Sequence, residues 1–215
     1  METRDIGTRQ MRAVATSFET RSDDDGNQYI EGYFSVFNSV YDMGQGMSES
    51  IAPHAFDDTL ADDIRCLTNH DTRLVLGRTS AHTFELRQDE HGLWGRVLIN
   101  PNDTDAMNTK ARVDRGDVNQ ASFGFDILQE DTDIREDGSV HWTIKKVKLY
   151  ECSVVTFPAY TETNLSARQK DFDEIKKRSL EAWKLETRNR LKGESNDGTQ
   201  SINCEEEPSG EDQTA

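Results

Sequence analysis

The sequence has few of the residues that cross-link small proteins or bind metals in them. Its 215 residues include three cysteines, Cys66, Cys152 and Cys204, which are too few and too widely spaced for a disulfide framework. We therefore expect reduced thiols in a compartment like the cytosol. No Cys-x-x-Cys or His-Glu-x-x-His spacing occurs, so the usual zinc signatures are absent. We predict neither a metal ion nor another cofactor.

Long apolar runs are also missing. No stretch is apolar enough to cross a bilayer, and the N-terminal residues lack the apolar core of a signal peptide, so we expect no membrane association and no export. Hydrophobic residues make up 33% of the chain and charged residues 31%. This low hydrophobic content indicates that part of the chain lies outside a packed core.

Basic residues are outnumbered by acidic ones. Lys and Arg total 25 against 41 Asp and Glu, and the formal net charge is -16. A surface of this sign disfavours the groove of a nucleic-acid duplex, so we predict no specific nucleic-acid partner. Proteins with basic surfaces are the partners that such a charge would steer towards it.

The C-terminal part of the chain divides by charge into two pieces. Residues 193–215 contain seven acidic residues and no Lys or Arg, and this composition predicts a disordered acidic tail. Residues 168–192 are rich in basic residues and predict an amphipathic helix, ending near Gly193. One face of this helix carries apolar side chains, namely Phe172, Ile175, Ala182 and Trp183. The helix either packs on the body of the protein or docks on an assembly partner. Residues 1–167 remain as the predicted main domain.

The main domain is predicted to be mainly β with peripheral helices. Segments rich in aromatic and β-branched residues predict strands at 29–37, 93–99, 121–128, 140–149 and 149–157. Asp137-Gly138 predicts a hairpin turn between two of them. Helices are predicted at 53–63, where Pro53 suits a first turn, and at 103–115, where Asp103 or Thr104 suits an N-cap. Strands interrupted by so few helices favour a closed or nearly closed antiparallel β-barrel.

Ser122 is a candidate nucleophile because of its place in a predicted strand. In an extended segment 121–128, Ala121, Phe123, Phe125 and Ile127 point to one side, and Ser122 points to the other beside Gly124. With the aromatic side in the core, the serine would have a rigid support and open space, as a nucleophile needs. An ordinary strand serine fits the same pattern.

His70 and Glu151 are candidates to act with Ser122. His70 is predicted at a strand end or turn near the core, and an imidazole there suits proton transfer near neutral pH. In an extended 149–157, Glu151 would share a face with Leu149, Ser153 and Val155, where a buried carboxylate needs a partner. An imidazole would be one such partner, and an Arg or Lys on an adjacent strand would be another.

Taken in order, several segments resemble the prohead maturation proteases of tailed phages. They are 31–37 (EGYFSVF), 51–56 (IAPHAF), 67–71 (LTNHD), 76–79 (LGRT), 92–94 (GLW), 122–125 (SFGF) and 151–160 (ECSVVTFPAY). The resemblance covers about residues 10–165. The prohead protease family is in turn similar, at a greater distance, to the assembly proteases of herpesviruses. This similarity implies a β-barrel of the herpesvirus-protease type wrapped by helices.

The resemblance implies a serine endopeptidase in which His70 is the general base and Ser122 the nucleophile. Glu151 would be the third member, with His141 as its competitor, because the herpesvirus relatives have a histidine in that role. Backbone N–H groups should stabilise the oxyanion, and Arg112, Arg115 and Gly116 are candidate donors ahead of the Ser122 strand.

The resemblance also implies where the enzyme acts and on what. The substrates would be a scaffold protein or the scaffolding segment of the major capsid protein, and the enzyme itself, inside the immature capsid in the host cytoplasm. A homo-oligomer stays open. The alternative is a non-catalytic capsid assembly module on the same fold. An esterase or acyltransferase with the same Ser/His chemistry is a further rival.

Overall fold

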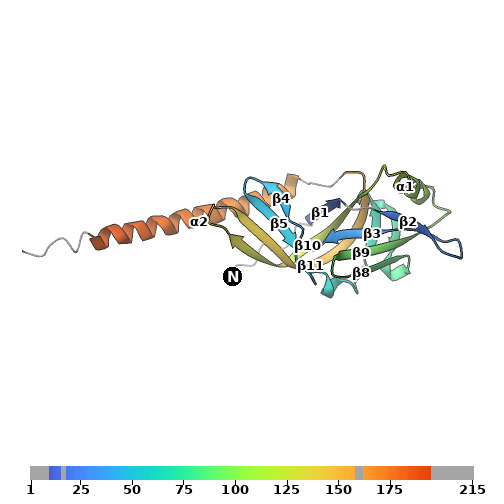
Figure 1. Cartoon of the computed structure of the whole chain (residues 1–215), viewed down its shortest axis with the longest axis horizontal. Helices are drawn as coiled ribbons and strands as arrows, with labels where there is room; N and C mark the ends of the chain where they lie inside the picture. Colours follow the sequence, from blue (N-terminus) through green and yellow to red (C-terminus); the bar gives the residue numbers. More distant parts are fainter. Residues whose placement is uncertain (1–9, 16–17, 158–161, 195–215) are drawn as a thin grey trace, which may run out of the picture. The chain divides into compact units, whose positions relative to one another are not determined.

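The computed structural model describes residues 10–15, 18–157 and 162–194, and the chain divides into two compact units, residues 1–172 and 173–215. The first unit contains two β-sheets and a short helix (Figure 1). The second begins within the long helix α2 (Glu162–Glu194). The predicted acidic tail at 193–215 lies, apart from its first two residues, outside the described part of the chain.

The larger sheet includes the segments that carry the three candidate residues His70, Ser122 and Glu151. Its main path runs β1-β10-β11-β5-β4, and β6 and β7 branch from β11. The bounds of these strands are β1 Gln10–Ala15, β4 Tyr41–Gly44, β5 Met47–Ile51, β6 Arg65–Thr68, β7 Asp71–Arg78, β10 Gln120–Ile134 and β11 Val140–Val155. The central pair, β10 and β11, is an antiparallel hairpin. Its turn contains Asp137 and Gly138, as the sequence predicts, and Gly138 has the positive φ that such a turn requires.

The smaller sheet is entirely antiparallel and has the order β2-β3-β9-β8. Its strands are β2 Glu19–Ser22, β3 Gln28–Val36, β8 Phe84–Gln88 and β9 Gly92–Ile99. The predicted strands at 29–37 and 93–99 correspond to β3 and β9. The segments at 140–149 and 149–157, which were predicted as two strands, form the single long strand β11.

The prediction of a mainly β domain with peripheral helices is confirmed, but the pairing of the described strands forms two open sheets instead of one closed ring. The larger sheet is also not purely antiparallel, because β5 and β6 both run parallel to β11. The length of β11 explains the difference. Its first part pairs with β5 and its last part with β6, so the ladder branches instead of closing.

The helix predicted at 53–63 is wrong. This segment is a series of turns with one short 3₁₀ helix, η1 (Asp57–Thr59). Besides bonds within its own turns, the segment bonds to β11: the Ala52 N–H donates to the Ile144 carbonyl, and the Ala55 carbonyl accepts from the Val147 N–H. Phe56 is fully buried in the core. Tertiary hydrogen bonds and burial therefore override the local helical pattern.

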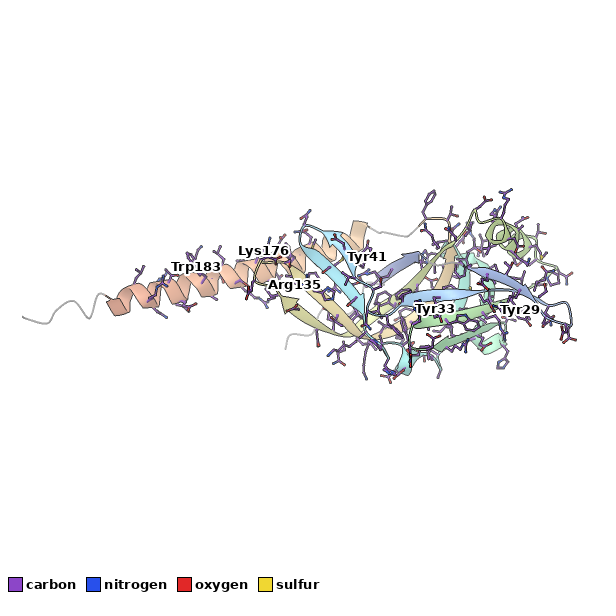
Figure 2. The ribbon with its side chains drawn as sticks, viewed as in Figure 1. Tyr29, Tyr33, Tyr41, Arg135, Lys176 and Trp183 are labelled. Atoms are coloured by element: carbon purple, nitrogen blue, oxygen red, sulfur yellow. The ribbon has the colours of Figure 1, made fainter. Side chains whose placement is uncertain are left out.

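The other helices follow the predictions more closely. Helix α1 (Thr104–Asp114) starts where it was predicted, and the Asp103 side chain caps it by accepting from the N–H groups of Asp105 and Ala106. Helix α2 begins before the predicted 168–192. On it, Phe172 is buried, whereas Trp183 is 61% exposed (Figure 2). No helix in the described ranges is both long and apolar enough to span a membrane.

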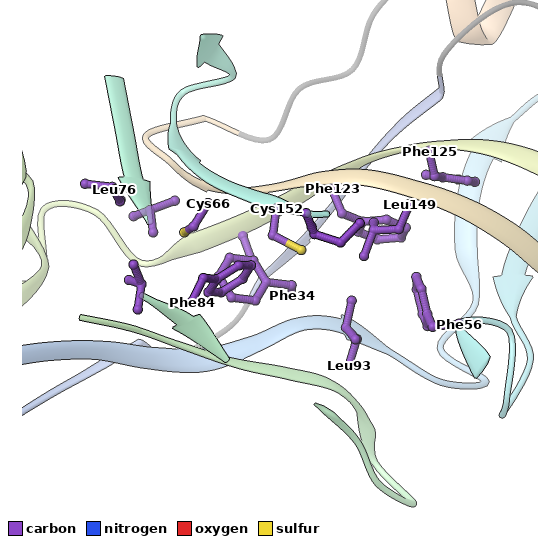
Figure 3. Packing of buried hydrophobic residues seen from close by; sticks show 14 of the residues in the cluster. Phe34, Phe56, Cys66, Leu76, Phe84, Leu93, Phe123, Phe125, Leu149 and Cys152 are labelled. Atoms are coloured by element: carbon purple, nitrogen blue, oxygen red, sulfur yellow. The ribbon is translucent and has the colours of Figure 1, made fainter. Parts of the chain in front are cut away.

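The core lies between the two sheets. It covers one side of β10 and β11, so a catalytic site on these strands has to lie on the other side. Phe34, Phe84 and Leu93 of the smaller sheet pack in one cluster with side chains of the larger sheet, including Phe123 and Cys152 (Figure 3). Burial raises the pKa of the Cys152 thiol well above its usual value, so this cysteine is an inert core residue. Side chains that alternate with these core residues point to the other side of the sheet.

Candidate active site

His70 is held in a strained turn between β6 and β7. Asn69 and His70 both have positive φ, 52° and 61°, a conformation that few residues other than glycine adopt. The end of β11 fixes the turn: the Asn69 N–H donates to the Val154 carbonyl, and the Asn69 side-chain oxygen accepts from the Thr156 N–H at 2.8 Å. The predicted location of His70, at a strand end near the core, agrees with this turn.

Ser122 lies on β10, on the side of the sheet opposite the core. Ala121, Phe123 and Phe125 are fully buried in the hydrophobic cluster, as the alternation predicts. Ser122 is directly paired with Ser153 of β11, and Gly124 with Glu151. Directly opposed residues of an antiparallel pair project to the same side, so the side chains of Ser122, Ser153 and Glu151 share one side.

The face that the sequence predicts for Glu151 is only partly correct. A shift in register separates the pairs Gly124–Glu151 and Phe125–Leu149, so Tyr150 is an extra residue in β11. Leu149 consequently lies in the core instead of beside Glu151. Glu151 is 5% exposed and faces polar partners.

His70 and Glu151 contact each other directly. The His70 Nδ1 and Glu151 Oε1 atoms are 2.7 Å apart, and because an ionised carboxylate only accepts, Nδ1 carries the proton. The space for this carboxylate comes from Gly124, where a Cβ atom would lie 2.5 Å from Oε1. The imidazole thus lies beside the Glu151 carboxylate, on the side of the sheet that carries Ser122, and its Nε2 is left to accept a proton.

Ser153, which is not among the candidates from the sequence, completes this arrangement. Its Oγ donates to Glu151 Oε2 at 2.6 Å and accepts from the His70 main-chain N–H at 3.3 Å. The signal was present in the sequence, because residues two apart on a strand share a face. Without knowledge of the β6–β7 turn, however, nothing indicated that the main chain of residue 70 would lie beside it.

Ser122 itself is bonded away from the imidazole. Its Oγ donates to the main-chain oxygen of Arg12 in β1 at 2.9 Å, and the residue is fully buried. The His70 Nε2 atom is also buried, and it has no hydrogen-bond partner among the described residues. The serine and the imidazole lie on one side of the same sheet, and in this state their reacting atoms are not bonded to each other.

The remaining candidates lie elsewhere. The two ring nitrogens of His141 face the hydroxyls of Ser48 and Ser50 on β5, and burial lowers the pKa of His141. The N–H groups of Arg115 and Gly116 bond carbonyls at the end of α1, which removes them as oxyanion donors in this state. Within the described ranges, no group of three or more His, Cys, Asp or Glu side chains is placed to hold a metal ion.

Comparisons with known proteins identify the family of this chain. The family of caudovirus prohead serine proteases matches residues 16–178. The prohead protease of Enterobacteria phage HK97 is 34% identical over 165 residues, which cover 74% of this chain and 68% of that protein. Among solved structures, the bacteriophage T4 capsid assembly protease, gp21, is similar with a TM-score of 0.45 and 10% identity, over 68% of this chain and 96% of that chain. The chain therefore belongs to the caudovirus prohead serine protease family, the serine proteases of phage capsid maturation.

Proposed function

We propose that Ser122, His70 and Glu151 are the nucleophile, the general base and the orienting carboxylate of this endopeptidase. One observation carries the proposal: the His70 Nδ1–Glu151 Oε1 contact of 2.7 Å on the Ser122 side of the sheet. A carboxylate that holds Nδ1–H fixes the tautomer in which Nε2 is a base, and it stabilises the imidazolium that forms.

Ser153 is the other serine near the histidine, and its contacts argue against it as the nucleophile. Its hydroxyl proton is donated to Glu151, on the Nδ1 side of the ring. A serine deprotonated by His70 has to face Nε2 instead. Ser122 lies opposite Ser153 on the neighbouring strand and is the serine that can supply this proton once its hydroxyl leaves the Arg12 carbonyl.

The reaction then follows the two steps of acyl transfer. Ser122 Oγ attacks a peptide carbonyl while His70 Nε2 takes its proton, and the same proton passes to the leaving amine. Water, deprotonated by His70, hydrolyses the acyl-enzyme and frees Ser122. Burial of Glu151 strengthens its interaction with the imidazolium, since little solvent screens the two charges.

The substrates that fit this enzyme are capsid assembly proteins. We propose that it cleaves a scaffold protein or the scaffolding segment of the major capsid protein, and also itself, inside the immature capsid in the host cytoplasm. Membership of the prohead protease family supports this assignment, and the strongly acidic chain suits approach to basic protein surfaces.

Co-expression with the capsid proteins tests the proposal. Mass spectrometry should find the scaffold or capsid segment cut in the presence of the wild-type chain and intact with Ser122→Ala. Ser35→Ala is the matched control, because Ser35 is also fully buried on a strand and lies in β3, away from the site. Cleavage that persists with Ser122→Ala would refute the assignment. Capsids that assemble and mature identically with the wild-type chain and with Ser122→Ala would favour a non-catalytic assembly module.

A further inference from the structure

Attack by Ser122 on a peptide requires hydrogen-bond donors for the oxygen of the peptide carbonyl. This oxygen takes up negative charge when the serine adds to the carbonyl, and donors that are fixed in place stabilise it. The main-chain N–H groups of Arg115 and Gly116 are bonded to carbonyls of α1. Side chains on the Ser122 side of the larger sheet are another source of donors.

The central hairpin presents a short row of side chains on this side (Figure 1). Residues two apart on a strand share a side, and so do residues directly opposite each other on an antiparallel pair. Over residues 120–126 of β10 this rule selects Gln120, Ser122, Gly124 and Asp126, and their partners on β11 are Val155, Ser153, Glu151 and Lys148.

Most donors in this row are bonded elsewhere or lie far from the serine. The hydroxyls of Ser153 and of the adjacent Tyr150 each donate to a carboxylate of the same side. Lys148 belongs to a pair that is four residues along β10 from Ser122, which is about 13 Å. Gln120 is the remaining donor of the row.

Gln120 is the first residue of β10, and it is half-buried. Because it precedes Ser122 by two residues on a regular part of the strand, their Cα atoms are about 7 Å apart and their side chains share a side. The Gln120 side-chain amide has two N–H donors, and within the described ranges neither of them makes a hydrogen bond. The amide is therefore available to a ligand beside the nucleophile.

The charges around Ser122 favour the Gln120 flank for an oxyanion. On the other flank, the Glu151 carboxylate occupies the space over Gly124. A buried carboxylate would repel an oxyanion there, because little solvent screens the two charges. On the Gln120 flank, the opposing residue of β11 is Val155, which is apolar and 1% exposed. A hydrogen bond to a developing charge is strengthened in apolar surroundings of this kind.

We propose that the side-chain amide of Gln120 donates a hydrogen bond to the oxyanion and is a catalytic residue of this protease. When Ser122 Oγ adds to the peptide carbonyl, its proton passes to His70 Nε2 and the π electrons of the carbonyl move onto the oxygen. The Gln120 Nε2–H donates to this oxygen until the electron pair returns and expels the amine, which takes the proton from His70. This inference rests on the proposed role of Ser122.

Substitutions of Gln120 in the full chain test the inference, with a fluorogenic peptide that spans a cut found by co-expression. Gln120→Ala should lower kcat by about 10²- to 10³-fold, the usual effect of losing one oxyanion donor. KM should change little, because the interaction forms only in the transition state. Gln129→Ala is the matched control, since Gln129 is an exposed glutamine on the same strand, and it should behave as the wild type.

Two charged variants separate a donor from a merely structural residue. Gln120→Glu should lose at least as much kcat as Gln120→Ala, because its carboxylate repels the oxyanion and has no N–H. Gln120→Lys should lose less than Gln120→Ala, because its ammonium group donates. Circular dichroism spectra of all these chains should match that of the wild type.

A fluorescent serine-directed phosphonate gives a readout that needs no known substrate. Its phosphonyl oxygen takes the place of the oxyanion, so the labelling of Ser122 should slow in Gln120→Ala and Gln120→Glu by factors that follow those for kcat.

Wild-type turnover and labelling in Gln120→Ala would overturn the inference, as would a loss confined to KM. Equal losses of kcat in Gln120→Glu and Gln120→Lys would also overturn it, because they would show a structural role alone. If the wild-type chain is neither labelled at Ser122 nor active on the capsid proteins, the proposed function fails and the role of Gln120 fails with it.

Discussion

The Glu151 carboxylate accepts hydrogen bonds from both His70 Nδ1 and the Ser153 hydroxyl. A carboxylate that is 5% exposed needs such donors, because burial without them costs several kcal/mol. Each of the two Glu151 carboxylate oxygens has one donor, and Ser153 Oγ accepts a hydrogen bond from the main-chain N–H of His70. The position of the imidazole therefore depends on contacts to its ring and to its main chain.

Ser153→Ala should lower kcat without removing activity. Hydrogen bonds to charged groups contribute about 1.5–3 kcal/mol, so we expect kcat to fall by about 10- to 100-fold, and Ser153→Thr, which keeps the hydroxyl, to lose less. Ser35→Ala should leave kcat unchanged. A Ser153→Ala chain that is less stable but turns over as fast as the wild type would show that Ser153 has a structural role alone.

Gly124→Ala should act through the same carboxylate. Its Cβ would lie 2.5 Å from Glu151 Oε1, so the carboxylate has to move away from His70. A displacement of about 1 Å in an active site lowers the reaction rate on the order of 100-fold. We expect kcat/KM to fall by about that factor while the circular dichroism spectrum is retained. Wild-type kcat/KM in Gly124→Ala would contradict the geometry of the His70–Glu151 contact.

Among the structural elements, the sequence pattern predicted single strands well. It failed where the structure depends on pairing or hydrogen bonds between segments. Alternation along 121–128 placed Phe123 in the core and Ser122 on the other side, because the pairing of β10 with β11 is regular from Gln120 to Gly124. The same reasoning misplaced Leu149, because the extra residue at Tyr150 in β11 shifts the register. Similarly, the turns at 53–63 depend on hydrogen bonds to β11, which local propensity does not contain.

The buried Glu49 carboxylate of β5 accepts from Arg12 of β1 and from Arg168 of α2, and Arg168 also donates to Glu130 of β10. This Glu49 ion-pair group joins four elements, and it should make stability depend on pH in acid. Burial alone would raise the pKa of Glu49, but Arg12 and Arg168 outweigh it and lower the pKa from 4.5 to about 2. Because the folded state favours the ionised form, its contribution is complete above about pH 4.5 and is lost as the pH falls towards 2.

Glu49→Gln should therefore lower the free energy of unfolding by about 3–5 kcal/mol at pH 7, the usual cost of breaking a buried ion pair. The difference from the wild type should shrink between pH 4.5 and 2.5, as measured by urea unfolding. Glu85→Gln is a suitable control, because Glu85 pairs with Arg96 at the surface and should change stability by less than about 1 kcal/mol. An equal difference at pH 7 and pH 3 would contradict the ion-pair explanation.

For the whole molecule, the candidate site lies entirely on the unit of residues 1–172, since β10, β11 and the turn between β6 and β7 supply it. A sequence resemblance was enough to select His70, Ser122 and Glu151 as candidates, because their segments have distinctive neighbours in the chain. Ser153 and Arg12 could not be found in this way. Their contacts depend on a turn and on an N-terminal strand that meet β10 and β11 only in the folded chain.

Removal of residues 193–215 should leave peptidase activity within about twofold of the full chain, because the tail lies outside the unit that holds the site and has too few apolar residues to pack. The division of the chain into a protease domain at 1–167, a basic helix at 168–192 and an acidic tail stays a prediction that this truncation addresses. Turnover of a peptide substrate by the full and shortened chains is the measurement. Complete loss of turnover in a folded, shortened chain would refute it.

We expect the histidine and carboxylate pair to activate Ser122 on β10 and not Ser153 on β11. Peptide mapping after reaction with a serine-directed phosphonate distinguishes the two, since Ser122 and Ser153 lie on separate strands. The adduct should appear on Ser122, and His70→Ala should abolish it. An adduct on Ser153, or one on Ser122 that forms equally fast in His70→Ala, would contradict the proposed role of Ser122.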